Sequence, residues 1–472
     1  MANASRAYRA PYAETLMAVR FIVIGGGPAG AHAATTAARL GAEVTVVERD
    51  VIGGAANLWD CIPSKAMIAT GGLMSVTSRA EDMGLQPIAA ALDTDALGGR
   101  IKEIESGLSD SISELMESQG IRVVHGSATL KGPHEIVVEP VDGPSEELTA
   151  EAILISTGSR PRIPDWAEPL IDGQRVLTTR QAYPPPEMPR HLVVIGSGVT
   201  GVEFVHMFSS LGSRVTLIVS RQHVLPQKDA EVAAALEEDF VRRGVELLKG
   251  ARASGIDKSN DGVVVRCEDG RSVSGTHALL AVGSIPNSEG LGLDAAGVEV
   301  DAGGYVPVNQ HCQTNVGHIY AAGDLSGRLP LASVAAMQGR KVAEHVMGLH
   351  TRKHRHLDYD KAASAIFTEP EIADVGLAEA EAFAIGRKIR VTKVPFAANA
   401  RALIDGDARG FVKVVSDPYT GVVLGGSIVG RGAAELISVL AVAVTNNLKV
   451  TDIIESLLVH PALAEALADA AE

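Results

Sequence analysis

Residues 21–30 read FIVIGGGPAG, and the predicted fold follows from this segment. Its apolar residues predict a buried strand, its glycines a tight turn, and the alanine-rich sequence that follows a helix. The pattern returns at residues 192–201 as LVVIGSGVTG. It continues into a second strand, where residues 40–48 (LGAEVTVVE) match residues 211–219 (LGSRVTLIV). Two βαβ units that each open with G-x-G-x-x-G predict two Rossmann-like dinucleotide-binding domains.

The glycines of each copy have separate physical tasks. In order, they permit the tight turn, the approach of the backbone to a pyrophosphate, and the close packing of helix on strand. They are Gly25, Gly27 and Gly30 in the first copy and Gly196, Gly198 and Gly201 in the second. One such match is weak evidence, whereas two at matched spacing are improbable as coincidental turns.

The two copies differ where dinucleotide specificity is set. Glu48 ends the second strand of the first copy, near the spacing of about 20 residues at which a carboxylate binds ribose hydroxyls. The second copy has Val219 there, followed by Ser220 and Arg221, so a guanidinium replaces the carboxylate and a 2′-phosphate becomes acceptable. The first copy is predicted to bind FAD and the second NADPH, with NADH also possible. The alternative for Arg221 is a solvated surface arginine.

The chain, at 472 residues, is too long for one hydrophobic core. Apolar strands at residues 153–159 and 278–284 are each followed by a proline, which predicts that the second Rossmann unit is inserted in the first domain. From about Thr351 strand-like stretches precede apolar helices. The predicted α/β fold therefore has an FAD-binding domain, an inserted NAD(P)-binding domain and a C-terminal α+β domain. Their limits are 17–158 with 286–353, 159–285, and 354–472.

Composition excludes several classes of protein. The chain is 46% hydrophobic with 49 glycines, which is typical of an α/β protein and not of a disordered one. A net charge of −15 argues against non-specific binding to nucleic acid or anionic lipid. Three scattered cysteines, with no recognisable signal peptide or membrane-spanning run, predict a cytoplasmic protein. Met17 is a candidate natural start, which would make residues 1–16 an extension. No metal site is predicted.

Residues 53–65, GGAANLWDCIPSK, carry the chemistry. With the two nucleotide folds, this segment resembles the flavoprotein disulfide reductase family, which includes dihydrolipoamide dehydrogenase and glutathione reductase. Further matching segments are residues 314–324 (TNVGHIYAAGD), residues 364–373 (SAIFTEPEIA) and His460-Pro461. The resemblance covers the chain from Met17 onward. It implies that Asp324 binds the flavin ribityl chain and that the C-terminal domain, with its apolar stretch Ala433–Leu448, forms a homodimer.

The chain departs from the family at one decisive position. Members carry G-G-x-C-x-x-x-x-C, whose cysteines form a disulfide that the flavin reduces. Here Ala56 stands at the first cysteine, while Cys61 matches the second, which lies against the flavin. The lost thiol is the one that attacks a disulfide substrate, and Cys267 or Cys312 could replace it only if the Cα atoms came within about 7 Å. Cys61 either tunes the flavin or is an inert thiol.

The resemblance implies two further pairs. Lys65 would lie near flavin N5, held by Glu203, and a cation there stabilises reduced flavin; the alternative for Lys65 is a surface lysine. His460 and Glu465 would form a dyad offered to the partner subunit's site, either to protonate a quinone oxygen or as a structural relic. The remaining cofactor-binding candidates are Arg49, Gly54, Ala56, Ser127, Thr157, Gly158, Gly283, Leu331 and Ala332.

The resemblance to an actinobacterial subgroup that lacks the first cysteine implies an FAD-dependent NAD(P)H:quinone oxidoreductase. The alternatives are a dihydrolipoamide dehydrogenase-like disulfide reductase, favoured by the His460–Glu465 dyad but contradicted by Ala56, and a soluble pyridine nucleotide transhydrogenase. A non-enzymatic FAD-binding subunit is the third reading, which the set of candidate cofactor residues disfavours.

Overall fold

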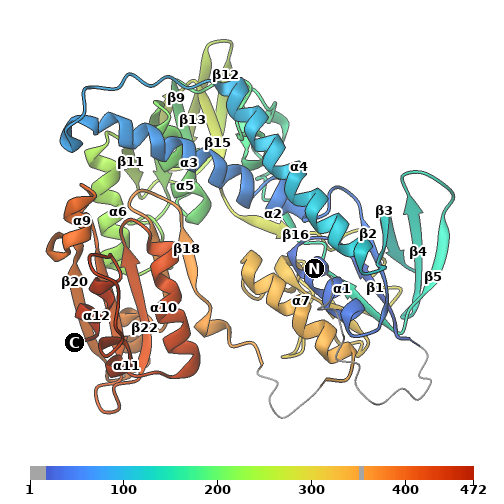
Figure 1. Cartoon of the computed structure of the whole chain (residues 1–472). Coiled ribbons are helices and arrows are strands. Elements are labelled where there is room, and N and C mark those ends of the chain that lie inside the picture. Colours follow the sequence, from blue (N-terminus) through green and yellow to red (C-terminus); the bar gives the residue numbers. More distant parts are fainter. Residues whose placement is uncertain (1–17, 350–355) are drawn as a thin grey trace, which may run out of the picture. The chain divides into compact units, whose positions relative to one another are not determined.

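The computed structural model describes residues 18–349 and 356–472 (Figure 1). Met17, residues 1–16 and Thr351, which carry sequence predictions, lie outside these ranges. The chain divides into two compact units of three segments each. The first contains Met1–Gly54, Ser111–Gly158 and Ser288–His356, and the second contains Ala55–Asp110, Ser159–Asn287 and Leu357–Glu472. This division assigns residues 55–110 to the second unit, and the predicted limits of the domains stay predictions.

The first unit is built on a seven-stranded sheet with the order β17-β6-β1-β2-β3-β4-β5. The strands from β17 to β3 run parallel, and β4 and β5 extend the sheet as antiparallel hairpins. The strands are β1 Arg20–Ile24, β2 Glu43–Glu48, β3 Arg122–Leu130, β4 Glu135–Pro140, β5 Glu146–Thr149, β6 Ala152–Ile155 and β17 Ile319–Ala321. Alternate residues of β1 enter two different hydrophobic clusters, so both faces of the sheet are covered.

Two helices of the first unit lie side by side. They are α1 (Pro28–Arg39), which follows β1, and α7 (Ala332–Val346). Their backbones approach so closely that a Cβ atom at Gly339 would lie 1.9 Å from the carbonyl oxygen of Ala29. Glycine at this position therefore brings the middle of α7 next to the start of α1, where the first glycine turn ends.

The second unit contains a second parallel sheet with the order β11-β10-β9-β15-β8. Its elements are β8 Val176–Thr178, β9 His191–Ile195, α5 Val199–Ser210, β10 Arg214–Val219, α6 Ala230–Arg242, β11 Glu246–Lys249 and β15 His277–Leu280. An antiparallel sheet is inserted before β15, from β12 Ala253–Ser259, β13 Gly262–Cys267 and β14 Ser272–Gly275. Strands β7 (Ser159–Pro161) and β16 (Ser284–Pro286) pair with each other and hold the two prolines that follow the apolar strands.

Three helices lie between β2 and β3 in the sequence. They are α2 (Gly54–Leu58), α3 (Cys61–Ser78) and α4 (Thr94–Ser118), and the boundary between the units falls within α2 and α4. Helix α3 packs along α5, where a Cβ atom at Gly71 would lie 3.0 Å from the Ser210 side chain. Short 3₁₀ turns are η1 Ala80–Met83, η2 Glu168–Leu170, η3 Thr179–Gln181, η4 Gly323–Ser326, η5 Tyr359–Lys361 and η6 Phe396–Ala398.

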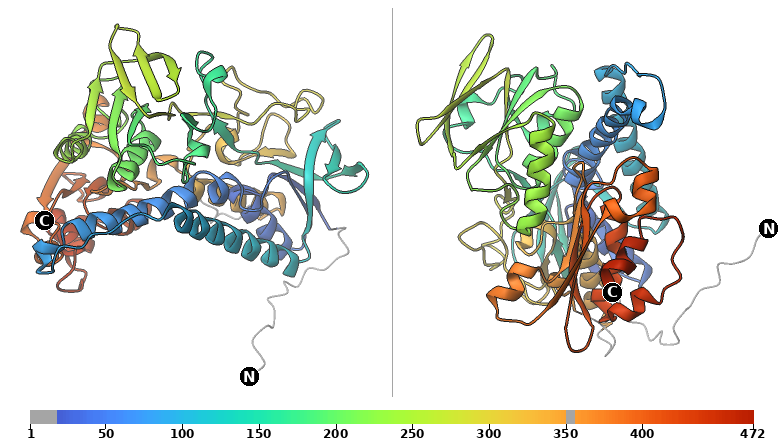
Figure 2. Two further views of the ribbon diagram at one scale, coloured as in Figure 1. Left: turned by 90° about the horizontal axis from the view of Figure 1, so that it is seen from above. Right: turned by 90° about the vertical axis from the view of Figure 1, so that its left-hand side faces the viewer.

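The C-terminal part is an antiparallel sheet with helices, seen on the near side in the right-hand view of Figure 2. Its sheet order is β18-β19-β22-β21-β20, and α10 packs on β19 and β22. The elements are β18 Ser364–Ile366, β19 Ile372–Gly376, α8 Glu379–Ala384, β20 Arg390–Pro395, α9 Ala400–Ile404, β21 Phe411–Ser416, β22 Val423–Val429, α10 Ala433–Asn446, α11 Val450–Ile454 and α12 Glu465–Ala471. Within the described ranges, no helix is both long and apolar enough to cross a bilayer.

Buried ion pairs join the C-terminal sheet to the inserted Rossmann domain. Lys413 in β21 is 2% exposed, and its Nζ lies 3.0 Å from Asp229 at the start of α6 and 3.1 Å from Glu379. Burial alone would lower the pKa of Lys413, but its carboxylate partners outweigh burial and raise it. Arg409 Nη1 lies 2.9 Å from Asp239 of α6. Arg409 Nη2 also lies 2.6 Å from Glu369 Oε1, so the same arginine ties the turn after β18 to α6.

Candidate active site

The first glycine turn joins β1 to α1. Gly25 has a φ of 101°, and a Cβ atom there would lie 2.4 Å from the carbonyl oxygen of Ser156. A Cβ atom at Gly30 would lie 1.9 Å from the Gly25 carbonyl oxygen, so α1 can pack on β1 only with glycine there. At Gly27, by contrast, a Cβ atom would meet just the Cα atom of Gly54, at 4.0 Å, among the described atoms. This open space at a helix N-terminus fits the pyrophosphate of FAD.

The carboxylate of Glu48 is fixed beside this turn. Glu48 is buried; its Oε2 accepts a hydrogen bond from the Gly26 N–H at 2.6 Å and its Oε1 accepts one from the Asp50 N–H at 2.7 Å. The Gly53 N–H donates to the Gly26 carbonyl at 2.9 Å, which holds Gly53 and Gly54 against the first turn. The carboxylate is therefore where the ribose of a dinucleotide would need it.

The other candidates for FAD lie at strand and helix ends of the first unit. Thr157 and Gly158 follow β6, while Leu331 and Ala332 open α7. Asp324 lies in η4, which is anchored where the Gly323 N–H donates to Gln338 Oε1 at 2.7 Å.

Two further candidates, Arg49 just after β2 and Ser127 within β3, are exposed. Arg49 is exposed and pairs with Asp50 at 3.4 Å, and Ser127 is exposed in β3 opposite Glu139. Their roles stay predictions.

The second glycine turn repeats the constraints of the first. Gly196 has a φ of 112°, and a Cβ atom at Gly201 would lie 1.9 Å from its carbonyl oxygen. A Cβ atom at Gly198 would meet no described atom within 4 Å, so space for a ligand is again present at a helix N-terminus. Gly283, with a φ of 99°, follows the neighbouring strand β15. These residues fit the pyrophosphate of a second dinucleotide.

The specificity position of the second copy lies at the end of β10. Val219 is fully buried, whereas Ser220 and Arg221 are exposed. The Arg221 carbonyl accepts a hydrogen bond from the Gly250 N–H at 3.0 Å, which fixes its backbone and leaves the guanidinium directed to solvent. The geometry is open to a 2′-phosphate, and the role of Arg221 stays a prediction.

Three elements of the second unit meet at Lys65. Its Nζ lies 3.0 Å from Oε2 of Glu203, in α5, and 4.7 Å from the centroid of the Phe367 ring, just after β18. The other carboxylate oxygen of Glu203, Oε1, accepts a hydrogen bond from the Phe367 N–H at 3.0 Å. The Glu203 side chain is 9% exposed and that of Lys65 is 31% exposed. One ammonium group is thus held between a carboxylate and an aromatic face.

The cysteines match the pattern read from the sequence. Ala56 lies within α2, and Cys61 is the first residue of α3 and is partly buried. All three cysteines, which lie in the described part of the chain, are thiols and not disulfides. Cys267 and Cys312 are enclosed in separate hydrophobic clusters, and burial raises the pKa of the Cys267 thiol. Both are therefore poor substitutes for an exchange thiol.

His460 and Glu465 form the predicted pair. The His460 Nδ1 lies 2.8 Å from Glu465 Oε1, while Oε2 accepts a hydrogen bond from the Ala462 N–H at 2.8 Å. These contacts, the Ala462 N–H first and His460 second, lower the pKa of Glu465. The His460 side chain is 74% exposed, so its second ring nitrogen is accessible to another molecule.

Four residues around Cys61 and Lys65 were missed by sequence reasoning. Phe367 and Trp59 lie inside segments that carry the family resemblance, but no sequence pattern assigned a function to them. Arg180 and Tyr183 had no sequence signal, because they reach the site through contacts between distant segments. Tyr183 stacks on Phe204 with ring centroids 5.2 Å apart. Burial, and then the nearby charges of the active-site residues, raise the pKa of Tyr183 well above its usual value.

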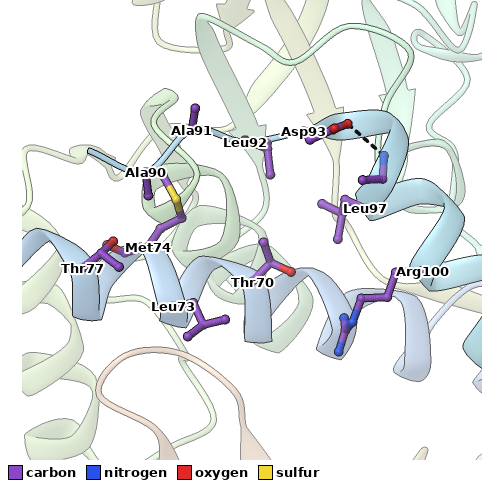
Figure 3. Close-up of a pocket in the computed structure, with 11 residues that line it drawn as sticks. Thr70, Leu73, Met74, Thr77, Ala90, Ala91, Leu92, Asp93, Leu97 and Arg100 are labelled. Atoms are coloured by element: carbon purple, nitrogen blue, oxygen red, sulfur yellow. Dashed lines mark hydrogen bonds between the residues drawn. The ribbon is translucent and has the colours of Figure 1, made fainter. Parts of the chain in front are cut away.

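A separate pocket of about 270 Å³ lies between α3 and α4. Thr70, Leu73, Met74 and Thr77 share one face of α3 at helical spacing, opposite the extended residues 90–93 (Figure 3). Leu97 and Arg100 of α4 complete the wall. Lys65 does not line this pocket, so the pocket is separate from the contacts that Lys65 makes with Glu203 and Phe367.

The fold and these sites match a known family. The model described as "Pyridine nucleotide-disulphide oxidoreductase" matches residues 19–339, and its dimerisation domain matches residues 362–471. The chain belongs to this family of oxidoreductases, which use FAD and NAD(P)H, and it carries the family's dimerisation domain. The predicted family and the predicted architecture, two Rossmann-like domains with a C-terminal dimerisation domain, are confirmed.

Three named relatives show which members of the family this chain is similar to. A Mycobacterium tuberculosis protein named NAD(P)H dehydrogenase (quinone) is 41% identical over 466 residues, covering 96% of this chain and 94% of that protein. The crystal structure of LpdA from Mycobacterium tuberculosis superposes with a TM-score of 0.91 at 41% identity, covering 96% of this chain and 99% of that one. A dihydrolipoyl dehydrogenase from Zymomonas mobilis is 34% identical, covering 94% of this chain and 96% of that protein.

Proposed function

We propose that this chain is an FAD-dependent NAD(P)H:quinone oxidoreductase. The observation that carries the proposal is Ala56, which has no sulfur to form a disulfide with Cys61. A disulfide substrate needs an exchange thiol, whereas a planar acceptor can take electrons from a cofactor directly. The mycobacterial relative named NAD(P)H dehydrogenase (quinone) supports the same acceptor class.

The chemistry would come from FAD and the geometry from the protein. Bound FAD would accept a hydride from NAD(P)H and pass two electrons to the quinone, while the protein supplies protons. Lys65 would keep a positive charge beside the reacting centre. Its partner Glu203 lies in α5, the helix whose N-terminus carries the second glycine turn, so nicotinamide binding and the ammonium position share one rigid element.

His460 would deliver the proton. With Nδ1 bound to Glu465, its Nε2 is available to exchange a proton with a quinone oxygen. Its exposure supports action in the partner subunit's site of a homodimer, which the dimerisation domain favours. We assign Cys61 to the flavin environment and not to bond exchange. We also propose NADPH as the preferred donor, on the basis of Arg221, and a reducing cytoplasmic location, on the basis of the thiol state of the cysteines.

A second candidate is disulfide reduction, as in dihydrolipoyl dehydrogenases. The observation that favours it is the His460–Glu465 pair, which an enzyme without an exchange thiol has less need to keep. A further alternative is soluble transhydrogenation, which, like quinone reduction, needs no cysteine pair.

One acceptor comparison separates these candidates. The purified holoenzyme is reduced with NADPH under anaerobic conditions and mixed with menadione, with lipoamide or with a second nicotinamide dinucleotide. We expect fast reoxidation by menadione alone, retained in Cys61→Ser. Rapid turnover of lipoamide would overturn the quinone proposal, and exchange confined to the dinucleotide would favour transhydrogenation.

A further inference from the structure

Hydrogen bonds fold the segment just before α3 into a tight turn. The carbonyl oxygen of Ala55 accepts hydrogen bonds from the N–H groups of Trp59, at 2.9 Å, and Asp60, at 2.8 Å. The Ser64 hydroxyl donates to the carbonyl oxygen of Asp60 at 2.7 Å and lies 3.0 Å from that of Cys61. The chain is thus folded back on itself immediately before the active-site helix, and Trp59 projects from this turn.

The guanidinium of Arg180 covers the indole ring of Trp59. The Cζ atom lies 4.3 Å from the ring centroid, within the range of a cation–π contact. Arg180 also donates from Nη2 to the carbonyl oxygen of Ser159 at 3.0 Å, at the first residue of β7. One side chain therefore connects the turn before α3 to the strand that leads into the inserted Rossmann domain.

Hydrogen bonds also fix the segment that carries Arg180. It lies in η3, which follows β8 and has a capping box: Gln181 Oε1 accepts a hydrogen bond from the Thr178 N–H at 2.8 Å. Tyr183 follows on the same segment and stacks on Phe204, the residue after Glu203. Arg180 and Tyr183 thus contact Trp59 and Phe204 from the segment that follows β8.

We propose that Trp59, held by Arg180, is a positioning residue that fixes the first turn of α3 where Ala56 leaves no disulfide to do so. That turn begins at Cys61, and Lys65 follows it one helical turn later. This pair, the Trp59–Arg180 clamp, contains no thiol, so electron transfer forms and breaks no covalent bond in it. This inference rests on the proposed function for its significance, but its test does not depend on quinone turnover.

Fluorescence can report the clamp directly, because the chain has two tryptophans. In a Trp166→Phe holoenzyme, Trp59 is the one remaining tryptophan, so the tryptophan emission reports on it alone. Arg180→Met, which keeps length and removes charge, should shift and brighten its emission. Arg180→Lys, which keeps a cation over the ring, should restore most of the original spectrum. Arg175→Met is the matched control, since Arg175 belongs to the same unit and pairs with Glu187 instead.

Proteolysis supplies an independent measurement. Chymotrypsin cuts after leucine and aromatic residues, so it can cleave the turn at Leu58 and Trp59 when the turn opens. Arg180→Met should accelerate this cleavage by about 2- to 30-fold, the span that a cation–π contact supports. The acceleration should disappear in a Trp59→Leu background, where Leu58 is still cleaved, because the two side chains act as one pair. Added reductant should change neither result.

The outcomes separate the clamp from the proposed function. Quinone turnover should fall in Arg180→Met through kcat, with the KM for NADPH unchanged. Unchanged emission and cleavage in Arg180→Met would refute the clamp, as would equal effects in Arg175→Met. A holoenzyme that shows the clamp but reduces no quinone would leave this inference standing and overturn the proposed function.

Discussion

Replacing Ala56 with cysteine should change how many electrons the enzyme stores. Trp59 and Asp60, which donate hydrogen bonds to the Ala55 carbonyl, connect α2, which holds Ala56, to Cys61 at the start of α3. The new thiol would therefore be close to Cys61 along the chain. A disulfide that closes about six residues stabilises a loop by about 2 kcal/mol, which lowers its opening equilibrium about 30-fold.

Two measurements detect the effect of Ala56→Cys. In anaerobic titration with dithionite, the wild type should take up two electrons per FAD and Ala56→Cys should take up four. Chymotrypsin cleavage at Trp59 should slow by about 30-fold in oxidised Ala56→Cys and recover after reduction. The control is Ala56→Cys with Cys61→Ser, which should again take up two electrons.

Two results would refute this reasoning. A wild type that already takes up four electrons would mean that another thiol pair exists. An Ala56→Cys variant whose thiol count proves a disulfide, but whose electron capacity stays at two, would mean that Cys61 does not communicate with the flavin.

Three further predictions test other parts of the molecule. Arg221→Glu should raise the KM for NADPH about 10- to 100-fold with little effect on NADH, because the carboxylate repels a 2′-phosphate; equal losses in initial-rate assays would contradict that role. Gly198→Ala should fold normally but bind NADPH weakly by calorimetry, whereas Gly201→Ala, whose Cβ atom would lie 1.9 Å from a carbonyl oxygen, should lower the Tm. Burial and then Arg243 lower the pKa of His206 from 6.5 to about 3, so neutral His206 stabilises the fold above pH 6.5, and about 1.4 kcal/mol is lost per pH unit as the pH falls toward 3. His206→Gln, which keeps an acceptor for Arg243, should flatten the dependence of Tm on pH over that range, and an unchanged slope would count against it.

The nucleotide folds could be predicted from the sequence because their constraints are local. A glycine turn imposes its φ value and its steric limits within a few residues, and Gly25 and Gly196 meet nearly the same ones. Glu48 was predictable for the same reason, since it follows the turn at a fixed spacing. The family resemblance added Lys65 with Glu203, which lie 138 positions apart.

The remaining site residues depend on contacts that one sequence does not encode locally. Phe367 contacts Lys65 because ion pairs hold the C-terminal sheet against α6. Arg180 contacts Trp59 because it lies in η3, which follows strand β8 of the second parallel sheet. The choice between NADPH and NADH near Arg221 could not be predicted from the sequence either. An exposed guanidinium has the same sequence signature whether it binds phosphate or solvent.

The pairing of β7 with β16 has a practical consequence for engineering. Ser284 lies opposite Pro161 and Pro286 lies opposite Ser159, so the chain enters and leaves residues 162–283 at adjacent points. Such a segment is a cassette, because a donor module whose ends are equally close can be spliced in without new linkers. Coenzyme choice could then be exchanged by transplanting a whole module. The module would need counterparts of Glu203 and Arg180, because their partners Lys65 and Trp59 lie outside residues 162–283.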